Sequence, residues 1–123
     1  MSSEAIRRFA EKTPKQTEFG NMRLEIRDQA LCVNGSDEWK HVHAQAFQVL
    51  WYLAKADGGV VQTKELADWL NENAPLENQI TPDYMNIVGS IIKRLRVIMQ
   101  DIPTLRVRIA NDGPRYGYRL ETF

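Results

Sequence analysis

Residues 81–100 read T-P-D-Y-M-N-I-V-G-S-I-I-K-R-L-R-V-I-M-Q, and this stretch decides the fold. Three separate helix-start signals coincide at its beginning. Thr81 can cap a helix, Pro82 suits the first helical position, and Asp83 complements the positive end of the helix dipole. The sequence therefore predicts a helix over residues 82–100.

Placing successive residues about 100° apart divides this helix into two different faces. One face is apolar and suits packing on a core; it carries Tyr84, Ile87, Val88, Ile91, Ile92, Leu95, Ile98 and Met99. The other has no carboxylate beyond the first turn and carries Asn86, Gly89, Ser90, Lys93, Val97 and Gln100, with Arg94 and Arg96 on its flanks. This second face is either an ordinary solvated surface or a surface that enters the DNA major groove.

A basic hairpin is predicted directly after this helix. Residues 105–109, L-R-V-R-I, alternate apolar residues with arginines, as a half-buried strand does. Turn-forming residues follow at 110–115, and the chain returns as a second strand over 116–120. We therefore expect a C-terminal hairpin over residues 105–121.

Two motifs in these elements resemble those of one protein family. Residues 92–96, I-K-R-L-R, resemble the I-x-R-L-R core of the recognition helix in OmpR/PhoB-type winged-helix DNA-binding domains. Residues 114–120, P-R-Y-G-Y-R-L, resemble the G-Y-R-L ending of the family's wing, with a proline that is closer to the CadC/ToxR-like branch. The resemblance implies an α+β fold: a winged helix-turn-helix with an N-terminal antiparallel sheet, three helices and a C-terminal β-hairpin wing.

The first third of the chain fits that architecture. Apolar residues recur with period two over residues 22–42, which predicts three or four short antiparallel strands, and Asn-Gly at 34–35 is a hairpin signal. We assign residues 21–123 to the winged-helix domain and residues 1–20 to an N-terminal arm. A short helix is expected over 3–12 in that arm, which packs on the domain, contacts DNA or is frayed.

Two further helices are expected between the sheet and the long helix. Residues 44–56 carry apolar side chains at helical spacing. Residues 60–66, V-V-Q-T-K-E-L, resemble the family's V-V-S-R-E-E-L, which opens the first helix of the helix-turn-helix, so a helix is expected over 63–73. Where the family has L-T-P-x-E-F, this chain has V-H-A-Q-A-F. His43 thus replaces a hydroxyl cap, and Ala46 replaces a glutamate that commonly pairs with a basic residue of the recognition helix.

Composition indicates one globular domain without catalytic equipment. The chain has 123 residues, of which 43% are hydrophobic and 26% charged. Its N-terminus lacks the apolar core of a signal peptide, and no apolar run approaches about 20 residues. We therefore expect a cytoplasmic protein that does not enter the membrane. Cys32 suits a small core residue, and His41 and His43 lack metal-site spacing. No catalytic residue set is found, so we expect no enzymatic activity, no metal and no cofactor.

The charge is distributed unevenly along the chain. The formal net charge is zero, which argues against indiscriminate binding to nucleic acid. Residues 88–123, however, contain seven Lys/Arg and three Asp/Glu, a net charge of +4, which leaves −4 for residues 1–87. The positive part coincides with the long helix and the hairpin.

The predicted DNA contacts lie on three elements. The start of the helix over 63–73 is a favourable phosphate site. The outward face of the long helix offers side chains for base edges and flanking arginines for phosphates, although Arg96 is alternatively held in an internal ion pair. The hairpin offers arginines to a narrow minor groove. The predicted contact set comprises Thr63, Lys64, Asn86, Ser90, Lys93, Arg94, Arg96, Val97, Arg108 and Arg115.

Two functions are consistent with these patterns. The first is a stand-alone, sequence-specific regulator of transcription that binds double-stranded DNA and pairs on it. The resemblance implies contact with RNA polymerase through the loop over 71–81, for which a solvated connector is the alternative. The second is a winged helix used as a protein-interaction module or adaptor, which the neutral net charge, Val97 and Asp112 favour. The salt dependence of DNA binding separates the two.

Overall fold

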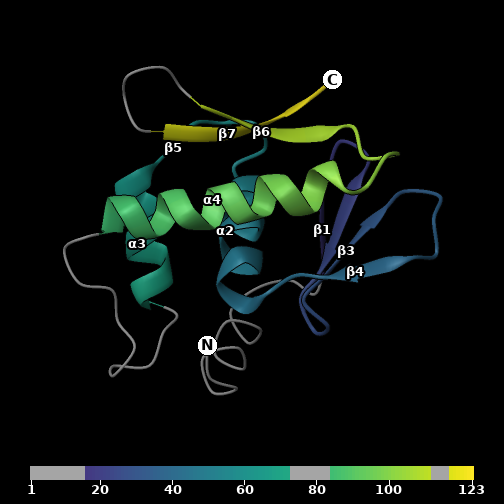
Figure 1. The fold of residues 1–123 in the computed structure, drawn as a ribbon, viewed down its shortest axis with the longest axis horizontal. Helices are drawn as coiled ribbons and strands as arrows, with labels where there is room; N and C mark the ends of the chain where they lie inside the picture. The colour runs from purple at the N-terminus through teal and green to yellow at the C-terminus, as the bar shows by residue number, and fades with distance from the viewer. Residues whose placement is uncertain (1–15, 73–83, 112–116) are drawn as a thin grey trace.

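The computed structural model describes residues 16–72, 84–111 and 117–123, and it confirms the predicted winged helix-turn-helix (Figure 1). The predicted helix end at 73 and the predicted helix start at 82 lie outside the described residues. The elements in chain order are β1 (Gln16–Phe19), β2 (Met22–Glu25), β3 (Ala30–Val33), β4 (Trp39–His41), α2 (Ala44–Lys55), β5 (Val61–Gln62), α3 (Thr63–Glu72), α4 (Tyr84–Gln100), β6 (Val107–Asn111) and β7 (Gly117–Thr122).

The N-terminal sheet has four antiparallel strands in the order β1-β2-β3-β4. Met22 and Leu24 are fully buried on its inner face, and Cys32 is buried as predicted. Strand β1 was not predicted, because Q-T-E-F has one apolar side chain and is partly exposed, so it carries no period-two signal. The sheet thus begins inside residues 1–20, which the sequence assigns to the arm. The helix expected over 3–12 lies outside the described residues.

The predicted hairpin forms a second sheet of three strands in the order β5-β7-β6. Strand β5 was not predicted, because two residues are too few to show a periodicity. Val61 and Gln62 form a strand only because they pair with Tyr118 and Gly117 of β7, more than fifty residues later in the chain. This pairing ties the start of α3 to the wing.

The helices contact both sheets, because α2 packs on β1 and β7 and α4 packs on β6. In Figure 1, α4 runs across the front, with the β6–β7 hairpin above it, α3 at one end and the N-terminal sheet near the other. It packs against both α2 and α3. Val88 and Leu95 of α4 and Trp51 of α2 are at most 1% exposed. His43 stands before α2 without a side-chain capping bond, so the substitution of the hydroxyl cap is not compensated locally. None of the described helices is long and apolar enough to cross a membrane.

The turn between β1 and β2 holds the connection between α4 and β6. The Asn21 side-chain amide nitrogen donates to the Thr104 carbonyl at 2.9 Å, and its oxygen accepts the backbone N–H of Arg106 at 3.0 Å. Gly20 precedes it with φ of 56°, a conformation that favours glycine, and a Cβ there would lie 2.7 Å from Cγ2 of Thr122. The turn between β1 and β2 thereby positions β6, the strand that follows α4.

Candidate nucleic-acid interface

The two faces predicted for α4 are present in the structure. Val88, Ile91, Ile92, Leu95 and Met99 are buried, and Ile87 and Ile98 pack partly buried against the same core. The outward face is exposed at Asn86, Ser90, Lys93, Arg94, Val97 and Gln100. From residue 86 onward this face contains no carboxylate. It is therefore a continuous surface of small, polar and cationic side chains.

Lys93 and Arg94 are the two cations of this face that point into solvent. Both are exposed, and neither makes a hydrogen bond or an ion pair with a residue that the structure describes. A surface lysine or arginine of an ordinary amphipathic helix often has a carboxylate three or four residues away. Because no carboxylate occurs at that spacing here, the charges of Lys93 and Arg94 remain available to an external anion.

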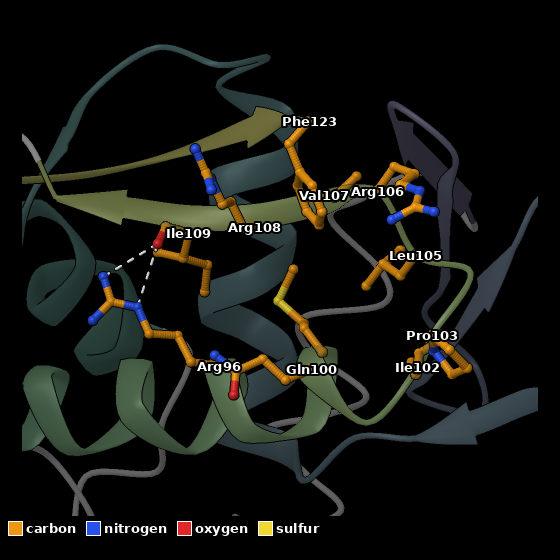
Figure 2. Close-up of a pocket in the computed structure, with 11 residues that line it drawn as sticks. Arg96, Gln100, Ile102, Pro103, Leu105, Arg106, Val107, Arg108, Ile109 and Phe123 are labelled. Carbon is orange, nitrogen blue, oxygen red and sulfur yellow. Dashed lines mark hydrogen bonds between the residues drawn. The ribbon is translucent and has the colours of Figure 1, made fainter.

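Arg96 has a different role from its two neighbours. It is partly buried, and its Nε and Nη2 donate to the Ile109 carbonyl of β6 at 3.3 and 3.2 Å (Figure 2). Its Nη2 also donates to the Asn111 side-chain oxygen. The internal partners are thus a carbonyl and an amide oxygen rather than the carboxylate of an ion pair. Arg96 joins α4 to the first strand of the wing.

Arg108 lies on the outer face of the wing, as predicted, but it is not alone there. Its side chain is 62% exposed, and its Nε donates to Oε1 of Glu121 at 2.5 Å. Glu121 also pairs through Oε2 with Arg119 at 2.9 Å. The hydrogen bond from Arg108 holds the pKa of the Glu121 carboxyl below its ordinary value, with the charges of both arginines adding to the effect. The carboxylate is therefore ionised at neutral pH and offsets one of the two positive charges.

The two residues predicted at the start of α3 differ in their accessibility. Lys64 is exposed and makes no interaction with the described residues, so it is available to a phosphate. Thr63 is only 4% exposed, which leaves little of its side chain for an external partner. Thr63 directly follows β5, and the sequence pattern did not indicate that β5 pairs with β7 at this point.

The wing carries cations that were not included in the predicted contact set. Arg106 and Arg119 share the outer face with Arg108, and Arg106 is exposed. The alternation of L-R-V-R-I already contained the signal for Arg106, because residues two apart in a strand lie on one face. Arg119 belongs to the G-Y-R-L motif, which was used only to identify the resemblance. Arg115 lies outside the described residues.

Comparison with known proteins identifies the fold. No protein-family model matches the sequence, and no protein of curated function matches it in a sequence search. Among solved structures, the DNA-binding domain of E. coli CadC superimposes with a TM-score of 0.67 at 19% identity, covering 89% of this chain and 94% of that domain. The Thermotoga maritima response regulator DrrB, an OmpR/PhoB homolog, gives a TM-score of 0.61 at 21% identity, covering 95% of this chain and 49% of that one. The chain therefore has the fold of an OmpR/PhoB-type winged-helix domain.

Proposed function

We propose that this protein is a sequence-specific regulator of transcription that binds double-stranded DNA, with α4 in the major groove. The observation that carries the proposal is the outward face of α4, which is exposed, free of carboxylates from residue 86 onward and supplied with two cations that have no partner among the described residues. An α-helix fits the major groove of B-DNA, and only in that groove does each base pair present a distinct pattern of hydrogen-bond donors, acceptors and methyl groups. The structural similarity to a domain that is itself described as DNA-binding supports the same conclusion.

The order of side chains along α4 suggests how each would contact the duplex. Lys93 lies on the midline of the exposed face, where a cation meets guanine O6 and N7. Val97, one turn later, is 55% exposed and presents methyl groups of the kind that contact thymine. Arg94 lies on the flank of the face and is suited to a phosphate, as is Lys64 at the start of α3. Base contacts and phosphate contacts thus come from different side chains.

We expect Arg94→Ala to weaken binding to all duplex sequences alike. If the guanidinium neutralises one phosphate, the slope of log Kobs against log salt becomes shallower by about one unit, since each phosphate contact contributes about −0.9 on B-DNA. The measurement is a titration of mixed-sequence duplex DNA by fluorescence anisotropy at several salt concentrations. Lys55→Ala is the matched control, because Lys55 is an exposed cation in the last turn of α2. An equal change of slope in both variants would contradict a specific contact by Arg94.

We expect Gly89→Ala to stabilise the fold and weaken DNA binding at the same time. Glycine inside a helix costs about 0.8–1 kcal/mol relative to alanine. A Cβ at Gly89 would meet no described atom within 4 Å, so packing inside the described fold does not require glycine. The added methyl group would instead hold the helix away from the groove floor.

Thermal denaturation and DNA titration of the same Gly89→Ala preparation check this prediction. Lys55→Ala is again the control, because Lys55 is exposed on α2, outside the proposed DNA-binding face. A Gly89→Ala variant that binds DNA as well as the wild type would show that close approach at this position is not needed.

A protein-interaction module is the second candidate function. Val97 is an exposed apolar side chain in the middle of the outward face, and the net charge of the whole chain is zero. An interaction module would bind duplex DNA without the steep negative salt dependence of phosphate contacts, or not at all. The salt titration of the wild-type protein therefore decides between the two functions.

A further inference from the structure

A cavity of about 380 Å³ lies where the recognition helix meets the wing. Its walls come from the last turns of α4, the connection over 102–105, strand β6 and the aromatic side chain of Phe123 (Figure 2). The DNA contacts proposed above are made by Lys64, Lys93, Arg94 and Val97, and none of these residues lines the cavity. It is therefore a separate feature of the fold.

The lining combines an apolar floor with positive charge. Met99, Leu105 and Val107 supply buried apolar side chains, and no aspartate or glutamate is among the lining residues. Arginines enter the lining from two elements, α4 and the β6 segment: Arg96, Arg106 and Arg108. An apolar cavity bordered by cations without a lining carboxylate is complementary to a molecule with an apolar body and a negative group.

Arg106 is the arginine best placed to receive that negative group. Arg96 is already engaged with the Ile109 carbonyl, and Arg108 is paired with Glu121. Arg106 has no carboxylate partner among the described residues, and its guanidinium lies 5.8 Å from the centre of the Phe123 ring. Its backbone N–H donates to the Asn21 side-chain oxygen at 3.0 Å, which fixes the backbone from which the Arg106 side chain extends.

We infer that this cavity binds a small organic carboxylate with an aromatic or aliphatic body, and that Arg106 pairs with the carboxylate. The volume is within the range of small-molecule sites, which begins near 300 Å³. Two other ligands fit less well. A phosphate of the DNA backbone would leave the apolar floor of the cavity uncovered, and an acidic peptide would need a longer binding surface than this cavity offers.

Binding at this place has a direct route to the DNA-binding surface. Arg96 spans the cavity from α4 to Ile109 of β6, and a ligand beside it changes how firmly the helix and the wing are held together. By linkage, a ligand that shifts DNA affinity is itself bound more or less tightly in the presence of DNA, by the same factor. This coupling rests on the proposed function, whereas the binding of the carboxylate does not.

The test uses the full chain without DNA and follows backbone amides by NMR. The probes are indole-3-acetate, 4-phenylbutyrate and octanoate, with indole-3-acetamide as the neutral counterpart of the first, and inorganic phosphate. We expect at least one carboxylate to shift the amides of residues 105–109 with saturation, and the neutral amide to bind about tenfold more weakly, the loss expected for one charge-assisted hydrogen bond. Arg106→Gln should lower carboxylate affinity by about the same factor, while Arg27→Gln, an exposed arginine outside the lining, should not.

Three kinds of result from the binding experiment overturn the inference. If no carboxylate saturates the shifts of residues 105–109, the cavity is not a ligand site. If the amide binds as well as the acid, or phosphate binds as well as either, the site does not recognise an amphipathic carboxylate. An acidic peptide such as Asp-Phe-Asp that binds more tightly than all the small acids would replace the small molecule by a protein partner. If Arg106→Gln does not fold, the comparison of acid with amide on the wild-type protein still tests whether the cavity recognises a carboxylate. Loss of DNA binding in the separate salt titration would affect the coupling alone.

Discussion

Leu95→Ala is expected to lower the free energy of unfolding by about 2–5 kcal/mol, the range observed when a large aliphatic side chain in a core is cut back to alanine. Leu95 is 0% exposed and lies on the face of α4 that packs against α2 and α3. The loss combines the transfer free energy of the missing atoms with the cavity that they leave, because the surrounding helices relax only partly. Since α4 also carries the proposed DNA-binding face, the variant should lose DNA affinity at temperatures where it unfolds.

Urea denaturation followed by circular dichroism measures this change. Val97→Ala is the matched control, because Val97 is on the same helix two residues later and is 55% exposed. Its free energy of unfolding should stay within about 0.5 kcal/mol of the wild type, as is usual for surface positions. A destabilisation by Leu95→Ala no greater than that of Val97→Ala would mean that the inner face of α4 is wrongly assigned.

Lys93→Ala is expected to cost about 1–3 kcal/mol of binding free energy on the preferred DNA site and to relax the choice of base at one position. Lys93 is exposed at the midline of the outward face and makes no interaction with the described residues, so its removal leaves the fold unchanged. The loss should be largest on the preferred site, because a base contact contributes to discrimination and not only to affinity. Selection of bound sequences from random duplexes, followed by titration on the selected site, gives both quantities.

Arg94→Ala is the control that separates a base contact by Lys93 from the general effect of losing one positive charge. It removes one exposed cation from the same helix, so both variants lose the same charge. If Lys93 reads a base and Arg94 meets a phosphate, only Lys93→Ala changes the preferred sequence. If both variants bind all sequences as tightly as the wild type while their circular dichroism is unchanged, DNA is not the ligand of this face, and the interaction module becomes the better account.

Local patterns in the sequence were sufficient for the parts of the fold that follow a regular period. The helical period separated Leu95 and Ile92 from Lys93 on α4, and the exposures in the structure agree with that division. The same holds for the hairpin, where Val107 and Ile109 are buried on the inner face. Such faces are predictable because side-chain direction within one helix or strand depends on the backbone geometry of that element alone.

The local pattern did not reveal which arginines have hydrogen-bond or ion-pair partners within the fold. Arg94 and Arg96 are two residues apart and carry the same charge, yet Arg94 is exposed whereas Arg96 donates to the carbonyl of Ile109. Arg108 looks like an unpaired wing arginine until β7 places Glu121 opposite it. In each case the partner lies thirteen residues away along the chain, beyond the reach of any periodicity.

The amino-acid pattern alone thus specified the helices, the two main faces of α4 and the basic hairpin, because these depend on backbone periods that neighbouring residues share. Only the tertiary structure made Val61 and Gln62 a strand, buried Thr63 beside it and formed the cavity at the α4–β6 joint. These features arise where segments distant in sequence meet, and a hydrogen bond or a cavity between two segments exists only once both are in place.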